Sequence, residues 1–202
     1  MAGALMDFER IVLADAELLL YRDFVAADEQ QRLLQRLLDE VSWRQDLIRL
    51  FGRDCRIPRL QQFQGDPGLG YRYSGLRLEA TPWHPLIASL RQRIAAIEPT
   101  AFNCVLLNLY RDGDDSMGWH SDDEPELGLN PVIASLSLGA ARDFVLRHRQ
   151  NPEQPRVSLR LEPGSLLLMR GPTQHHWQHA LPRRRRVQEP RANLTFRRIL
   201  DE

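Results

Sequence analysis

The stretch Arg191-Ala192-Asn193-Leu194-Thr195-Phe196-Arg197 alternates polar with apolar residues. A period of two is typical of a β-strand with one polar and one apolar face, so the two arginines are expected to share a face with Asn193 and Thr195. Two cations on an inward strand face require anions. The same pair would also be consistent with acidic side-chain partners or with a solvent-exposed sheet edge.

A second strand-like run covers residues 105–110, with the sequence Val-Leu-Leu-Asn-Leu-Tyr. Asn108 and Tyr110 fall on one side of this run. The planar guanidinium of arginine can hold a carboxylate through two parallel hydrogen bonds, and asparagine and tyrosine add neutral donors. Side chains of this kind would suit a dicarboxylate.

Helical patterns precede residue 103, and short strand-like segments follow it. Leucines at helical spacing predict a helix that Asp28 caps, and Thr81-Pro82 is expected to open a second helix. Pro163-Gly164 predicts a hairpin turn between two strands. The predicted fold class is α+β, with a double-stranded β-helix (jelly-roll) core buttressed by the N-terminal helices. The later strands are expected at Val132–Leu138, Phe144–His148, Val157–Leu161, Ser165–Met169 and Ala192–Phe196.

Residues 118–122, Gly-Trp-His-Ser-Asp, contain a His-x-Asp pair. On an extended segment His120 and Asp122 point to the same face and can bind one metal ion together. His179 is a candidate third ligand, although on spacing alone the neighbouring residues 175 and 176, both histidines, would serve equally well. Two imidazoles and one carboxylate leave other coordination positions open, which suits ferrous iron. The pair could equally be a surface feature, and the distal histidine a structural group.

Three specific motifs lie in the second half of the chain. They are NLYRDGDDSMGWHSDDE (Asn108–Glu124), LEPGSLLLMRGPTQHHWQHALP (Leu161–Pro182) and PRANLTFRRI (Pro190–Ile199). The chain, from about Leu50 to Ile199, resembles the AlkB family of iron- and 2-oxoglutarate-dependent nucleic-acid dealkylases. It is more similar to the branch of the mammalian DNA-repair homologues than to the bacterial founding member.

The resemblance assigns roles to residues of these motifs. His120, Asp122 and His179 are implied as ligands of Fe(II), with 2-oxoglutarate as co-substrate and O2 as oxidant. Arg191 is implied at the distal carboxylate of the co-substrate, and Arg197 nearer the metal. The complete set of implied 2-oxoglutarate contacts is Asn108, Tyr110, Arg191, Asn193 and Arg197.

The resemblance also implies the reaction and the organisation of the chain. An N-methyl group of 1-methyladenine or 3-methylcytosine in DNA would be hydroxylated and lost as formaldehyde, while the protein supplies orientation and excludes water. Residues 1–202 would form a single domain. Within it we expect an N-terminal extension with a helix (1–48), a nucleotide-recognition lid (49–80) and the jelly-roll catalytic core (103–199).

A damaged base inside a duplex has to be flipped out and stacked on flat side chains. Phe51 resembles the hydrophobic finger that fills the vacated stack, although an ordinary core phenylalanine would look the same. The two tyrosines at 71 and 73 resemble a base-stacking element, but cross-strand packing is also consistent with their spacing. The two acidic residues after Asp122 match positions that meet an exocyclic amino group, unless they are simply solvated. The implied substrate-base residues are Tyr71, Tyr73, Ser74, Asp123 and Glu124.

Residues 183–186 are four consecutive arginines. Four like charges seldom pack inside a protein, and their position soon after His179 favours contacts with DNA phosphates over a merely solvated run. Arginines near residue 55 are expected to complete the same rim. The predicted DNA contacts are Phe51, Arg53, Arg59, Arg183 and Arg184.

Composition limits the other possibilities. With 202 residues, 43% hydrophobic, the chain supports one domain with a sizeable core, and its net charge of zero argues against coating nucleic acid through bulk charge. All 27 basic residues are arginine, which excludes lysine-dependent chemistry. The two cysteines suggest neither a disulfide framework nor a zinc motif, and no signal peptide or membrane-spanning run is evident. We therefore expect a monomeric protein of the bacterial cytoplasm that binds no membrane.

Three functions are consistent with the sequence. The first is a DNA dealkylase, for which the possible finger at Phe51 weakly favours double-stranded over single-stranded DNA. The second is an oxygenase of the same fold that acts on RNA or on a protein side chain, which would need neither the finger nor the stacking pair. The third is a nucleic-acid-binding module without turnover, against which the full set of co-substrate residues stands.

Overall fold

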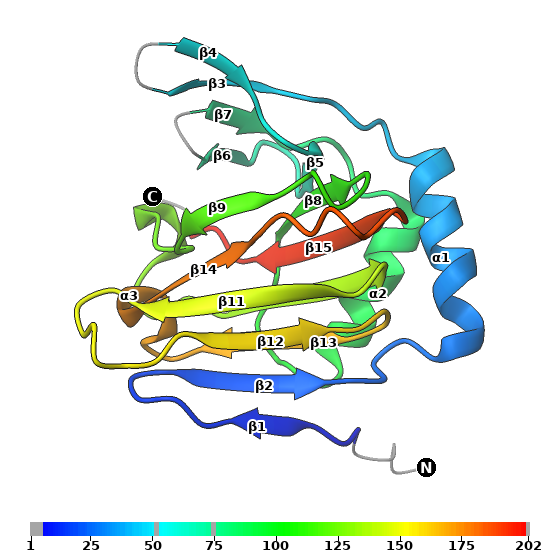
Figure 1. Cartoon of the computed structure of the whole chain (residues 1–202). Coiled ribbons are helices and arrows are strands. Elements are labelled where there is room, and N and C mark those ends of the chain that lie inside the picture. The colour runs from blue at the N-terminus through cyan, green and yellow to red at the C-terminus, as the bar shows by residue number, and fades with distance from the viewer. Residues whose placement is uncertain (1–5, 51–52, 74–75, 201–202) are drawn as a thin grey trace.

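Two antiparallel sheets face each other in the computed structural model, which describes residues 6–50, 53–73 and 76–200 (Figure 1). The seven-stranded major sheet has the order β1 (Glu9–Ile11), β2 (Glu17–Tyr21), β13 (Leu166–Arg170), β10 (Ile133–Gly139), β15 (Arg191–Arg197), β8 (Cys104–Tyr110), β5 (Leu60–Gly65). The minor sheet has the order β12 (Val157–Leu161), β11 (Arg142–His148), β14 (Trp177–Leu181), β9 (Met117–His120). The predicted jelly-roll core of an α+β fold is confirmed.

Strand β15 lies inside the major sheet, paired with β10 on one side and β8 on the other. All seven of its residues are buried. Ala192, Leu194 and Phe196 join the larger hydrophobic core, and the polar residues that alternate with them face the other way. The alternation read from the sequence thus puts four polar side chains between the sheets.

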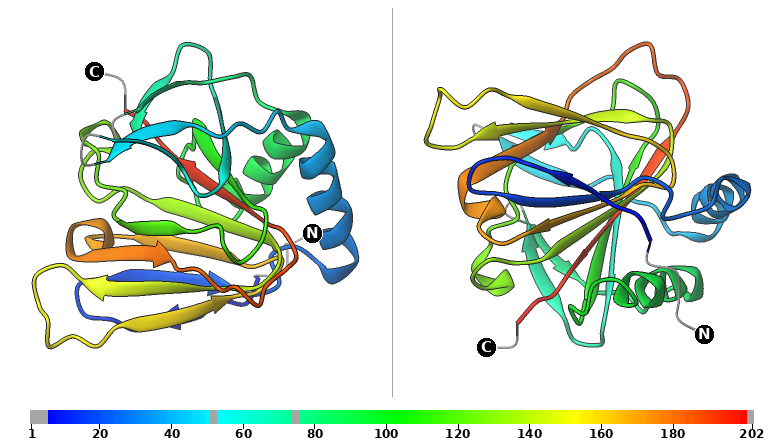
Figure 2. Two further views of the ribbon diagram at one scale, coloured as in Figure 1. Left: turned by 45° about the horizontal axis from the view of Figure 1, so that its top comes forward. Right: turned by 90° about the horizontal axis from the view of Figure 1, so that it is seen from below.

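The helices α1 (Ala27–Glu40) and α2 (Pro85–Ala95) lie on one side of the molecule (Figure 2), and both pack against the apolar side of the major sheet. Leu34 and Leu37 of α1 and Leu90 and Ile94 of α2 are buried in the same cluster as Phe196. Among the described residues, no helix is both long and apolar enough to cross a membrane.

Both predicted helix starts are wrong by a few residues. The residue before α1 is Ala26, whose side chain cannot cap the helix. Asp28 lies in the first turn, where its negative charge interacts favourably with the positive end of the helix dipole. Helix α2 begins at Pro85 because His84 caps it, with Nδ1 accepting from the backbone N–H of Leu86 at 3.3 Å. Thr81 instead donates its hydroxyl hydrogen to the carbonyl of Phe63 in β5.

The turn at Pro163-Gly164 and the N-terminal segment also differ from what the sequence suggested. Pro163-Gly164 joins β12 to β13, which belong to different sheets, so the turn is a crossover between layers and not a hairpin. Within the expected N-terminal extension (1–48), β2 pairs with β13, and its Leu18 and Leu20 are buried in the core, so this strand is part of the major sheet.

The predicted lid at 49–80 is interrupted by β5, which belongs to the major sheet. Among the described residues of this region, two hairpins form small sheets of their own, at the top of Figure 1. They are β3 (Leu47–Leu50) with β4 (Arg53–Arg56), and β6 (Gly70–Tyr73) with β7 (Leu76–Glu79). The short helices η1 (Pro125–Leu127) and α3 (Thr173–His176) complete the fold.

Gly139 and Gly68 provide a matched test of packing at the end of β10. Both have a left-handed φ, +83° and +86° respectively. A Cβ at position 139 would collide with the carbonyl oxygen of Pro190 and lie 3.0 Å from Leu34, whereas position 68 has open space. We expect Gly68→Ala to lower the free energy of unfolding by about 1 kcal/mol, and Gly139→Ala to lower it by about 3 kcal/mol or more. Urea denaturation measures both, and equal losses would contradict the role of the close approach.

Candidate metal centre and co-substrate pocket

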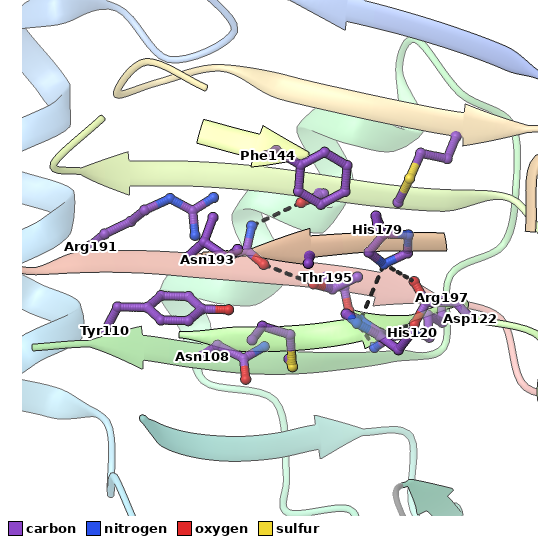
Figure 3. A pocket seen from close by; sticks show the side chains of 15 residues that line it. Asn108, Tyr110, His120, Asp122, Phe144, His179, Arg191, Asn193, Thr195 and Arg197 are labelled. Atoms are coloured by element: carbon purple, nitrogen blue, oxygen red, sulfur yellow. Dashed lines mark hydrogen bonds and ion pairs between the residues drawn. The ribbon is translucent and has the colours of Figure 1, made fainter. Parts of the chain in front are cut away.

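His120, Asp122 and His179 come together between the two sheets (Figure 3), with one donor atom of each within 4.8 Å of the others. His120 at the end of β9 is the register partner of His179 on β14. The two Nε2 atoms are 3.1 Å apart, and Oδ2 of Asp122 is 3.7 Å from Nε2 of His179. Donors about 2.1 Å from one ion and at right angles to each other lie about 3.0 Å apart. The geometry therefore fits a facial set of three metal ligands.

The ring of His120 is oriented for metal binding through Nε2. Its Nδ1 lies 2.9 Å from the carbonyl oxygen of Gly118, a contact that places the proton on Nδ1. The ring of His179 stacks on Phe144 of β11, with centroids 5.0 Å apart. Both imidazoles are thus held by groups outside the metal position.

The segment that carries Asp122 is anchored to α3 and to the first residue of β14. The backbone N–H of Asp122 donates to Oε1 of Gln174 at 2.9 Å, and Oγ of Ser121 donates to the carbonyl of Trp177 at 3.0 Å. Trp177 in turn donates its indole N–H to the carbonyl of Ala14 at 2.8 Å. These bonds fix the His-Ser-Asp segment relative to the strand that supplies the third ligand.

Arg197 holds the other oxygen of Asp122. Its Nη2 and Nε donate to Oδ1 at 2.6 Å and 3.2 Å, which leaves Oδ2 facing His179. Burial alone would raise the pKa of Asp122, but the charge of Arg197 and the two imidazoles outweigh it and lower the pKa to about 2. The carboxylate is therefore ionised before any metal arrives.

Burial has the opposite consequence for the histidines, because it disfavours their charged form. Burial, and next the neighbouring His120, lowers the pKa of His179 to about 3. The pKa of His120 is also lowered, mainly by burial. All three groups are in the protonation state that a metal requires.

One cavity joins this triad to the predicted dicarboxylate site. Arg191 and Tyr110 lie at one end, the triad at the other, and Asn193 and Thr195 between them (Figure 3). Every residue predicted to contact 2-oxoglutarate lines this cavity: Asn108, Tyr110, Arg191, Asn193 and Arg197.

The guanidinium of Arg191 is buried, at 2% exposure, and has no carboxylate within 4.0 Å among the described residues. Its Nη2 donates to Oγ of Ser137 at 2.9 Å, while Nε has no hydrogen-bond partner there. Burial lowers its pKa to about 10, so the side chain remains charged. A buried cation without a counter-ion is costly, and a carboxylate of the co-substrate would compensate it. The alternative of an acidic side-chain partner holds for Arg197 and fails for Arg191.

Several residues of the site were missed by the sequence analysis. Ser135 and Ser137 on β10 accept hydrogen bonds from Asn193 and Arg191, and Gln174 holds Asp122. The alternation Ser-Leu-Ser inside a predicted strand was the available signal for the serines. Nothing local marked Gln174, whose partner lies far away in the sequence.

Two arginines predicted to bind DNA have other partners. Arg59 is buried, at 5% exposure, and donates through Nε to Oδ1 of Asn108 at 2.8 Å, so it does not belong to a surface rim. Arg184 is partly buried and forms an ion pair with Asp143 at 2.7 Å. Arg53 and Arg183 are exposed, and for them phosphate contact stays a prediction.

The predicted finger and substrate-base residues fall in two regions of the chain, one before β8 and one after β9. Phe51 and Ser74 lie outside the described residues. Tyr71 and Tyr73 belong to β6, whose pairing is described without the positions of these side chains. Asp123 is exposed and paired with Arg149, and Glu124 immediately precedes η1.

Asp15, His148 and His176 form a second cluster of possible metal ligands. Nδ1 of His148 accepts the backbone N–H of Asn151 at 2.9 Å, which places the proton on Nε2, 3.5 Å from the carboxylate of Asp15. A protonated Nε2 cannot bind a metal. This arrangement supports a structural role for His148.

Comparisons of this chain with known proteins agree on one family. The family model of the 2OG-Fe(II) oxygenase superfamily matches residues 17–197. The DNA oxidative demethylase ALKBH2 of Homo sapiens is 43% identical over 180 residues, covering 86% of this chain and 69% of that protein; the Bos taurus protein is 44% identical, with 86% and 65% covered. The alpha-ketoglutarate-dependent dioxygenase alkB homolog 3 of Homo sapiens is 42% identical over 188 residues, covering 89% and 65%. The chain thus spans about two thirds of the length of these relatives. A solved structure, OsALKBH1, has the same fold, with a TM-score of 0.61 at 19% identity, covering 94% of this chain and 100% of that one.

The lowered histidine pKa values predict how metal binding responds to acid. Because His120 and His179 stay neutral below their ordinary pKa, protons do not compete with the metal in mild acid. We expect the Kd for Mn2+, an oxygen-stable substitute for Fe(II), to change less than about tenfold from about pH 7 to about pH 5. Two ordinary histidines would weaken binding roughly 500-fold over this interval.

Calorimetric titration at each pH measures this dependence. His179→Gln should lose most of the affinity for Mn2+, and the control His148→Gln should keep it. A steep loss of affinity with acid in the unsubstituted protein would contradict the protonation states inferred from the structure.

Proposed function

The chain belongs to the AlkB family of the 2OG-Fe(II) oxygenase superfamily, and we propose from this that it repairs alkylated DNA by oxidative demethylation. Its substrates would be 1-methyladenine and 3-methylcytosine. The observation that carries the proposal is the single cavity in which the His120, Asp122 and His179 cluster faces the uncompensated guanidinium of Arg191. The two ends suit a metal-bound oxoacid whose second carboxylate reaches the arginine.

Residues of the chain bind the co-substrate and orient it. Arg191 would hold the distal carboxylate with two parallel hydrogen bonds, and the buried floor around Ser137 and Asn193 would exclude water from it. Arg197 keeps Asp122 ionised and binds its Oδ1, so that Asp122 would offer a metal its other oxygen, Oδ2. Asn108, fixed by Arg59, bounds the same cavity.

When bound, iron, 2-oxoglutarate and O2 supply the oxidation of an N-methyl C–H bond, with succinate, CO2 and formaldehyde as products and the unmodified base restored. The chain provides no nucleophile or acid–base pair for this reaction, and none is needed. Its contribution is to hold the methyl group and the oxidant together in a site from which bulk water is kept out.

DNA as the substrate is supported by the relatives, two of which carry the name DNA oxidative demethylase. Exposed arginines at positions 53, 183, 185 and 186 offer contacts for phosphates. The free thiols of Cys55 and Cys104 are consistent with a reducing compartment, and we propose that a monomer acts in the cytoplasm.

The repair reaction can be tested directly. Protein loaded with Fe(II) and 2-oxoglutarate without oxygen is mixed with oxygen and a duplex that carries one 1-methyladenine. We expect restored adenine and formaldehyde in equal amounts, measured by mass spectrometry. Asp122→Ala should abolish both products, since only two metal ligands remain, while DNA binding persists.

The outcomes separate the proposed function from its alternatives. Decarboxylation of 2-oxoglutarate without repair would keep the oxygenase and assign it another substrate, such as RNA or a protein side chain. Absence of decarboxylation from a folded, metal-loaded protein would contradict the enzymatic function.

We also propose a preference for duplex DNA, with Phe51 as the residue that fills the vacated stack. Phe51→Ala should then lower kcat/KM on a methylated duplex by about tenfold or more and leave activity on the single strand nearly unchanged. Leu47→Ala is the control, because Leu47 lies close to Phe51 in the sequence and is 51% exposed on β3. An equal loss on both substrates, or the same loss in the control, would argue against a finger.

A further inference from the structure

A second buried arginine lies behind the pocket that contains Arg191. Arg142, the first residue of β11, is 1% exposed. Its Nη1 donates to the carbonyl of Asp112 at 3.0 Å, and its Nη2 donates to the carbonyls of Asp115 at 2.9 Å and Pro182 at 2.8 Å. The acceptors belong to the β8–β9 connection and to the segment after β14, so Arg142 fastens two loops together at this end of the barrel.

The two arginines meet at the ring of Tyr110, which lines the pocket. The guanidinium carbon of Arg142 is 5.8 Å from the ring centroid and that of Arg191 is 5.4 Å from it. Neither guanidinium has a carboxylate within 4.0 Å in the part of the chain that the structure describes, and the Nε of each is buried without a hydrogen-bond partner. Two positive charges therefore lie at the same ring without a direct ion pair, although the charges of Asp115 and Asp143 act on Arg142 from beyond 4.0 Å.

Two buried guanidiniums beside each other are electrostatically unfavourable unless an anion binds next to them. Burial is the main cause of the lowered pKa of Arg191; Tyr110 opposes this effect, and the charge of Arg142 adds to it, as expected for two neighbouring cations. The three carbonyl oxygens stabilise Arg142 as a cation, since each presents the negative end of a dipole. An anion bound by Arg191 would be attracted by both charges in a poorly screened site.

We propose that Arg142 is a positioning residue that gives the pocket its selectivity for an oxoacid with a distal carboxylate. Its charge adds to that of Arg191, and its hydrogen bonds hold the loops beside Tyr110. The proposal rests on the proposed function only in taking 2-oxoglutarate as the co-substrate. It assigns Arg142 no contact with the reacting atoms.

The test compares binding of two oxoacids to Mn2+-loaded protein in the absence of nucleic acid. 2-Oxoglutarate carries the distal carboxylate, and 2-oxovalerate has the same chain length without it. Calorimetric titration gives the Kd of each for the unsubstituted protein, for Arg142→Met and for Arg142→Lys. The control is Arg160→Met on the neighbouring strand β12, where the arginine side chain is 62% exposed and pairs with Glu162.

Arg142→Met should weaken 2-oxoglutarate about tenfold or more and change 2-oxovalerate by less than about twofold. Arg142→Lys retains the charge and should keep most of the preference for the diacid. Arg160→Met removes the same charge at the surface and should change neither Kd.

Equal weakening of both oxoacids in Arg142→Met would overturn the proposal, because it would mean a purely structural role. Unchanged binding of both would overturn it as well. Thermal unfolding reports whether the methionine variant folds; if it does not, loss of the preference in a folded Arg142→Lys overturns the proposal, and retention of the preference supports it. Failure of the unsubstituted protein to bind 2-oxoglutarate would contradict the proposed function itself, and this proposal with it.

Discussion

The structure depends on burying two guanidiniums on one central strand. Strand β15 is hydrogen-bonded on both edges and buried along its whole length, so Arg191 and Arg197 cannot turn to solvent. Each buried cation needs a negative partner. Arg197 finds it in Asp122, a residue that also faces two imidazoles, while Arg191 has none in the described chain. The site can therefore be understood as one compensated and one uncompensated charge at the two ends of a cavity.

The rest of the barrel shields the guanidiniums of Arg191 and Arg197 from water and holds them at separate positions. Ser137 and Ser135 of β10 accept hydrogen bonds from Arg191 and Asn193 of β15. Gln174 and Trp177 hold the metal-binding segment against β14. The apolar side of the same strand packs on α1 and α2, so the residues that stabilise the fold and those that form the site alternate along one backbone. We therefore expect a substitution on either face of β15 to disturb the residues on the other face.

The sequence predicted the parts of this arrangement that depend on local periodicity or on a specific motif. The alternation around Asn193 correctly identified the polar face of β15, and the resemblance selected His179 over two adjacent histidines, which the geometry of the cluster supports. Arg59 was misassigned because an arginine in a polar stretch is usually exposed, and only the tertiary structure brings it to Asn108. The turn at Pro163-Gly164 was recognised correctly as a turn, but which sheet each flanking strand joins is decided by pairing partners distant in the chain. Gln174 and Arg142 gave no local signal, since their partners are carbonyl and amide groups many residues away.

The position of β15 also has a consequence for biosynthesis. It is the last of the described strands, yet it lies between β8 and β10, which are made much earlier. On the ribosome those two strands must wait with open edges that can pair wrongly, and Asp122 waits without its cation. Until β15 has emerged and inserted, the nascent chain has all three metal ligands but lacks Arg197, which holds Asp122 in place. We therefore expect closure of the barrel and the final orientation of Asp122 to occur together, late in synthesis.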